Sequence, residues 1–200
     1  MRERGFYFSM GFSLLFWGVV TLFGAISTFY LEQIPHSEIA INNLWMILNL
    51  IAILVTSFVS GVVGLPETLR RIKNKLMKRE KREEKKENRI KGIAVMLSGF
   101  ILWTTVMTIP TLLPERLYPP LYLLALGVGH TMTYLIAYVT GNRHTVIQLG
   151  TGIVLIFLSF PFYYAINYLE ENILWLLSLL SGVIIYFISG LKLMEKAFRI

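Results

Sequence analysis

Between Phe6 and Leu31 the chain reads FYFSMGFSLLFWGVVTLFGAISTFYL, a run without a charged side chain. An α-helix rises about 1.5 Å per residue and the hydrocarbon core of a bilayer is about 30 Å thick, so roughly 20 apolar residues in succession can cross it. Core helices of soluble proteins do not need a continuous apolar run of this length. The segment therefore predicts a membrane-spanning helix.

Five further segments meet the same requirement. The six predicted spans cover residues of about 6–31, 43–65, 92–113, 119–140, 145–168 and 172–191. The composition agrees, because 55% of the residues are hydrophobic and 16% are charged, whereas soluble domains carry about 25% charged residues. Lipid offers no hydrogen bonds to an open backbone, and the segments lack the alternation of barrel strands. We predict an all-α, polytopic transmembrane helical bundle that forms a single domain over residues 1–200.

Lysine and arginine lie almost entirely on one side of the predicted spans. Of the 19 basic residues, only Arg116 falls on the side opposite the N-terminus. Cytoplasmic loops are enriched in basic residues, so both termini are predicted to be cytoplasmic and the protein to reside in the cell membrane. The outer connections carry Glu170 and Glu171 near interfacial aromatic residues such as Trp175, which favours the same orientation.

An alternative for the N-terminus is a cleaved signal peptide, because Arg2 and Arg4 precede the first apolar run. The apolar core of a signal peptide is about 7–15 residues long, which is shorter than this run. We therefore favour a first helix that is retained in the mature protein.

Two patterns concern the arrangement of the predicted helices. The first and third spans share a spacing, Met10 to Trp17 and Met96 to Trp103, which suggests three successive hairpins in the same orientation. Glycines at 127, 129, 150 and 152 lie in apolar runs with no strand before them. We interpret them as packing glycines and not as phosphate-binding loops.

The segment 66–91 between the second and third spans differs from the rest in composition. It holds 12 of the 19 basic residues and five of the 12 acidic residues, a surplus equal to the net charge of +7 of the whole chain. Leu69, Ile72 and Leu76 follow a helical spacing among its basic residues, which is typical of a helix at lipid headgroups. The candidate contacts to anionic lipid or to an acidic partner protein are Arg70, Arg71, Lys73, Lys75, Lys78 and Arg79.

The same basic segment has a simpler interpretation as a topology signal, because basic cytoplasmic loops orient most multi-pass proteins. It contains no aromatic side chain on which a base could stack, which argues against nucleic acid as a partner.

The residue inventory excludes several catalytic chemistries. The chain has no cysteine, and all 12 of its acidic residues are glutamates. None of these glutamates lies in the middle of a span, so thiol nucleophiles, thiolate metal sites and buried carboxylate relays have no candidates. His36, His130 and His144 do not cluster in sequence. We predict no enzymatic activity, no metal site and no cofactor.

One group of polar residues lies within a predicted span. His130, Tyr134 and Tyr138 are spaced four apart, with Thr133 beside them, and so follow one helix face. Polar groups in hydrocarbon need partners, which other spans can supply. With these partners, the candidate intramembrane site comprises His130, Thr133, Tyr134, Tyr138, Asn49, Gln148 and Asn167. This group is either a polar site for a small solute or a set of interhelical hydrogen bonds.

The leading functional hypothesis from the sequence is a transport-related membrane component for a small solute. The alternative is a non-catalytic scaffold, regulatory or assembly subunit that binds partner proteins or anionic lipids through the basic loop. A homo-oligomer or a partner membrane subunit is compatible with both. The two hypotheses differ in whether His130 lies in a water-accessible cavity or in a packed interior.

Overall fold

The computed structural model of the chain describes residues 2–36, 38–77, 101, 105, 108, 117–139 and 145–199. Its helices are α1 (Arg2–Leu31), α2 (Glu38–Met77), α4 (Tyr118–Val139), α5 (Val146–Ala165) and α6 (Glu171–Arg199). Each of the five is long and apolar enough to cross a membrane, and the described ranges contain no strand. The prediction of an all-helical membrane protein is confirmed for this part of the chain.

Two predicted segments lie wholly or largely outside the described residues. The first is the charged stretch 78–91, which includes Lys78 and Arg79. The second is the third span, about 92–113, of which only positions 101, 105 and 108 are described.

The observed helices extend beyond the predicted crossings at several ends. α2 continues past Leu65 to Met77, and α6 continues past Leu191 to Arg199. Backbone hydrogen bonds do not require apolar side chains, so a helix can leave the hydrocarbon layer unbroken. α5 is shorter than predicted, because residues 166–168 form a turn instead of a last helical turn.

α1 and α2 pack as an antiparallel pair. Gly24 of α1 lies under the indole ring of Trp45 on α2, and Gly5 lies near Val63. The indole Nε1–H of Trp45 donates a hydrogen bond to Thr28 Oγ1 at 3.0 Å. The glycine leaves room for the large ring, and the hydrogen bond fixes the ring across the two helices.

α1 also packs against α6, again with opposite direction. A Cβ atom on Gly11 would lie 2.9 Å from the carbonyl oxygen of Gly190, so the two backbones are in close contact. About two turns further along α6, Phe198 meets Phe8 edge to face, with ring centroids 6.4 Å apart. Because α2 and α6 are both antiparallel to α1, they run in the same direction.

α4 runs parallel to α6. Tyr118 at the start of α4 contacts Trp175 near the start of α6, with ring centroids 6.1 Å apart. Further along, Leu123 lies beside Gly182. α5 lies between α4 and α6 in the sequence. It runs in the direction opposite to α4 and packs against both helices. α4 therefore has the same direction as α6, and also as α2.

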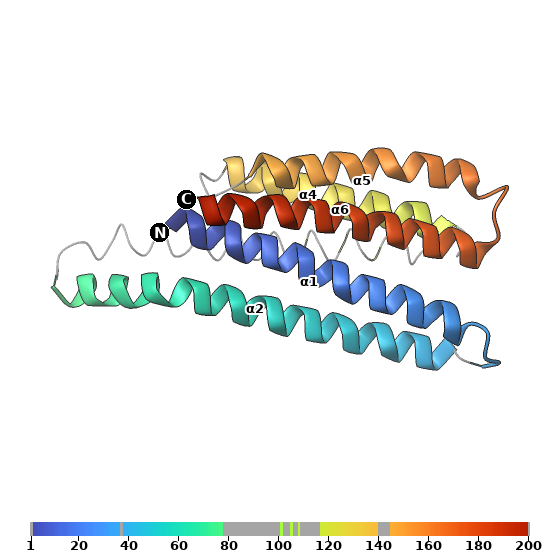
Figure 1. The fold of residues 1–200 in the computed structure, drawn as a ribbon, viewed down its shortest axis with the longest axis horizontal. Helices are drawn as coiled ribbons and strands as arrows, with labels where there is room; N and C mark the ends of the chain where they lie inside the picture. Colours follow the sequence, from blue (N-terminus) through green and yellow to red (C-terminus); the bar gives the residue numbers. More distant parts are fainter. Residues whose placement is uncertain are drawn as a thin grey trace.

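The main core lies where α1, α4, α5 and α6 meet. It consists of the buried side chains of Leu14, Leu123, Leu126, Leu155, Tyr186 and Leu193. α2 contributes to a smaller cluster with α1, formed by Val20, Leu48 and Ala52. Figure 1 shows α2 at the edge of the bundle, beside α1, and the two chain termini at the same end of the molecule.

Candidate functional site

His130 is the centre of the polar region that the described helices form. Its side chain projects from α4 and is 7% exposed, and Nε2 lies 3.1 Å from the hydroxyl oxygen of Tyr186 on α6. The two rings meet edge to face, with centroids 5.4 Å apart. The donor in this hydrogen bond depends on the histidine tautomer, because either ring nitrogen can carry the proton.

A second polar contact lies one turn further along α6. The hydroxyl of Thr151 on α5 donates to Oγ of Ser189 on α6 at 2.7 Å. Gln148, one turn before Thr151 on the same helix, is also buried. The polar region therefore connects α4, α5 and α6 through side chains on all three helices.

The backbones around this region are in close contact. A Cβ atom on Gly127 of α4 would lie 2.7 Å from the carbonyl oxygen of Gly152 on α5. A Cβ atom on Gly152 would collide with the side chain of Thr131. Both glycines are packing glycines, as the sequence predicts. The same prediction for Gly150 finds no support, because no described residue lies within 4 Å of its Cβ position. The small residues allow α4 and α5 to approach closely along this line of contact, which we call the α4–α5 seam.

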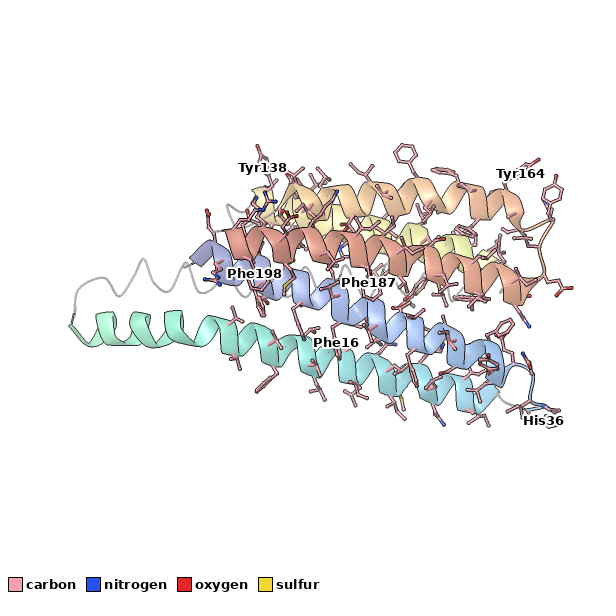
Figure 2. All side chains as sticks on the ribbon, viewed as in Figure 1. Phe16, His36, Tyr138, Tyr164, Phe187 and Phe198 are labelled. Atoms are coloured by element: carbon pink, nitrogen blue, oxygen red, sulfur yellow. The ribbon has the colours of Figure 1, made fainter. Side chains whose placement is uncertain are left out.

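Thr133 and Tyr134 are half-buried on α4, and Tyr138 is exposed. The Thr133 hydroxyl donates to the carbonyl oxygen of Gly129 in its own helix, at 2.7 Å. Tyr134 and Tyr138 stack on each other with ring centroids 6.2 Å apart, and the exposed Tyr138 lies at the periphery of the bundle in Figure 2. The predicted stripe therefore runs from the buried His130 to Tyr138 on the surface of the bundle.

The polar residues predicted as partners are only partly brought together. Gln148 is buried on α5. Asn49 is exposed on α2, and Asn167 is exposed in the turn after α5. The structure therefore buries His130 on α4 and Gln148 on α5 and leaves the two asparagines on the surface.

Tyr186 and Ser189 were not among the predicted partners of His130. A signal for Tyr186 was present, because Ser178, Gly182, Tyr186 and Gly190 are spaced four apart along α6 and all are buried. Four-residue spacing places small and polar residues on one helix face. Such a face is typical of a contact between helices in a membrane.

At the end of the bundle opposite the two chain termini, Glu32 directly follows α1 and Glu171 begins α6. Partial burial raises the pKa of the Glu32 carboxyl group, and the negative charge of Glu171 raises it further. Among the described residues, no group of three or more histidine, aspartate or glutamate side chains could hold a metal ion. The negative charge of Glu171 therefore disfavours the charged form of Glu32 at this end of the bundle.

The basic segment begins inside α2. We define the arm as residues 66–77, the last part of this helix, which contains Arg70, Arg71, Lys73 and Lys75. Figure 1 shows that α2 extends beyond the end of the other described helices, so the arm leaves the bundle as a continuation of a packed helix.

A comparison of the chain with protein-family models, curated proteins and solved structures finds no match. The class of protein therefore follows from the helices themselves. Among the described residues, five helices are long and apolar enough to cross a membrane, which makes this chain a multi-pass integral membrane protein.

Proposed function

We propose that the chain is a six-span, non-catalytic membrane scaffold of the cell membrane that presents a basic helical arm at the cytoplasmic surface. The single observation that carries the proposal is the continuity of α2 from Glu38 to Met77. Its 40 residues correspond to about 60 Å of helix, twice the thickness of the hydrocarbon core. A helix of this length joins a membrane-embedded segment to a basic one without a flexible linker.

The directions of the helices support six crossings. α2 and α4 run the same way, so the end of α2 and the start of α4 lie at opposite ends of the bundle. The chain between Met77 and Tyr118 has to return across the length of the bundle an odd number of times. One return within this interval accounts for the predicted third span and places both termini on one side.

The charge distribution supports a cytoplasmic location for the arm. With six crossings, the N-terminus, the arm and the C-terminal end of α6 share a side, and this side holds every basic residue except Arg116. The opposite side holds Glu32 and Glu171. This asymmetry matches the enrichment of lysine and arginine in cytoplasmic loops.

The contacts of His130 favour a scaffold over a solute carrier. The hydrogen bond to Tyr186 gives this histidine a role in joining α4 to α6. Thr151 and Ser189 join α5 to α6 in the same way. Asn49 and Asn167, which a solute site would have recruited, lie on the surface.

The topology can be tested directly, because the chain has no cysteine. Single cysteines replace Asn74, Leu117, Gln33 and Lys192, and intact cells are treated with a membrane-impermeant thiol reagent. We expect labelling at positions 33 and 117 and protection at positions 74 and 192. Labelling of positions 74 and 117 from the same side would overturn the six-span arrangement.

The scaffold role can be tested by co-purification from native membranes. The variant Arg70→Gln with Arg71→Gln removes two charges from the arm, and the matched control Lys192→Gln with Arg199→Gln removes two charges at the end of α6. We expect the arm variant to lose bound protein or lipid and the control to retain it. Identical co-purifying material from wild type and arm variant would contradict the proposal.

A further inference from the structure

The side of α2 that faces away from α1 carries exposed apolar side chains. Ile51, Leu54 and Phe58 are 43%, 60% and 72% exposed, whereas Ala52 is fully buried against α1. Among the described helices, only α1 packs closely on α2. In a membrane this outer face borders lipid, because exposed apolar side chains at membrane depth contact the acyl chains.

The apolar positions of the arm continue this face in register. Five turns of an α-helix cover about 18 residues, so positions 69, 72 and 76 lie on the same side of α2 as positions 51, 54 and 58. These three arm positions carry Leu, Ile and Leu. Position 70, an arginine, is in register with Ala52 on the opposite side. The lipid-facing stripe of α2 therefore extends into the arm.

The arm also carries a net positive charge. It contains Arg70, Arg71, Lys73 and Lys75, and a single acidic residue, Glu67. The cytoplasmic leaflet has a negative surface potential that attracts basic segments next to a membrane span. An amphipathic helix with basic flanks is the sequence type that lies in the headgroup layer.

α2 contains a proline, Pro66, at the position where the arm begins. Pro66 has no N–H group, so α2 lacks the hydrogen bond that residue 66 would donate to the carbonyl oxygen of Val62. Helices bend most readily at such positions. α2 is continuous through Pro66 in the structure, and a bend there away from α1 would turn the face of positions 69, 72 and 76 toward the membrane surface.

From these observations we infer that the arm binds the anionic cytoplasmic leaflet, with positions 69, 72 and 76 in the headgroup layer and its basic residues at the lipid phosphates. This inference rests on the proposed function and names the partner of the arm. The apolar residues at positions 69, 72 and 76 make the contact with the leaflet. The positive charge of the arm gives the preference for anionic lipid.

The test uses the full-length, cysteine-free chain in lipid nanodiscs. A single cysteine at Ile72 or at Asn74 carries an environment-sensitive fluorophore, and these two positions lie on opposite sides of the helix. We expect the label at position 72 to shift to the blue in nanodiscs that contain phosphatidylglycerol and not in phosphatidylcholine alone. The label at position 74 should remain in water in both. Equal emission in the two membranes, or an equal shift at both positions, overturns the inference.

Removal of the positive charges provides a second measurement. Replacing Arg70, Arg71, Lys73 and Lys75 by glutamine in the Ile72→Cys protein should weaken membrane association of the arm by about fivefold for each basic residue. High salt should also weaken the association of the arm with the membrane. A shift that persists in the uncharged variant overturns the assignment to anionic lipid.

The lipid inference and the scaffold proposal fail in different ways. In one outcome, the emission of the label at position 72 does not depend on lipid composition, and the Arg70→Gln and Arg71→Gln variant loses a cross-linked protein in native membranes. The arm then binds protein, and the lipid inference is overturned. If the label is insensitive and co-purification is also unchanged, both proposals are overturned.

Discussion

Gly127 and Gly152 face each other across α4 and α5 so closely that a Cβ atom on Gly127 would lie 2.7 Å from the carbonyl oxygen of Gly152. The same added atom would lie 2.7 Å from the backbone nitrogen of Ile156. The contact is with backbone, which cannot move aside as a flexible side chain can. This seam holds the two helices that flank the polar region around His130.

Gly127→Ala should destabilise the protein, because the added methyl group forces α4 and α5 apart. We expect a loss of about 1–3 kcal/mol, the usual cost of overpacking. Thermal unfolding in detergent, followed by the loss of the folded monomer, measures it. Gly150→Ala is the matched control on α5, where no described residue lies within 4 Å of the Cβ position, and it should be neutral or stabilising by up to about 1 kcal/mol. Equal effects of the two changes would contradict this account of the seam.

The hydrogen bond between His130 and Tyr186 should give a measurable coupling energy. A double-mutant cycle with His130→Phe and Tyr186→Phe isolates it, and we expect roughly 0.6 kcal/mol, the average for interhelical hydrogen bonds in membranes. The singly substituted His130→Phe protein should lose more, about 1–3 kcal/mol, because the buried Tyr186 hydroxyl loses its partner. Unchanged stability together with altered uptake of a solute would favour the transport hypothesis over the packing role.

The α1–α6 contact offers a second matched pair of glycines on one helix. A Cβ atom on Gly190 would lie 2.7 Å from Leu15 Cγ and 3.0 Å from the Gly11 carbonyl oxygen. Among the described residues, a Cβ atom on Gly182 would meet Leu123 Cδ2 alone, at 3.4 Å. Gly190→Ala should therefore lower the melting temperature more than Gly182→Ala. The reverse order in thermal unfolding would show that α1 and α6 do not meet at this glycine.

Glu32 should make the stability depend on pH. Burial and the Glu171 charge raise the pKa of its carboxyl group above the ordinary value of 4.5, so the folded protein binds this proton more tightly than the unfolded chain. The contribution of Glu32 to stability should then fall as the pH rises from 4.5 through the raised pKa, and the penalty should persist at neutral pH. Glu32→Gln should raise the melting temperature at pH 7 and reduce this slope.

The comparison at two pH values is the critical measurement for Glu32. Below pH 4.5 both proteins carry a neutral side chain at this position, so their melting temperatures should converge. A difference that is the same at pH 4 and pH 7 would mean that the carboxyl charge is not the cause.

Much of the fold follows from local sequence properties. The uncharged run 6–31 predicts α1, because the length of an apolar segment and the thickness of the hydrocarbon layer can be compared without knowing any neighbour. The positions of lysine and arginine predict an orientation in the same local way. Helix ends are less well predicted, as the continuation of α2 to Met77 shows, because hydropathy marks the apolar part of a helix and not its whole length.

The partners of the polar residues could not be predicted in this way. His130 was predicted to need a partner, but Tyr186 is 56 residues away in sequence and Asn49, an equally plausible candidate, faces outward. Which side of a helix faces its neighbours depends on its rotation about its own axis. In a helix that is apolar all round, composition carries little information about that rotation.

The amino-acid sequence by itself determined that the chain is a helical membrane protein with its positive charge concentrated after the second span, because apolar length and charge are properties of single segments. Only the tertiary structure decided that Gly11 meets Gly190, that Gly127 meets Gly152 and that His130 bonds to Tyr186. Those contacts depend on how closely separate helices approach and how each is rotated, and both are settled by packing across the whole bundle.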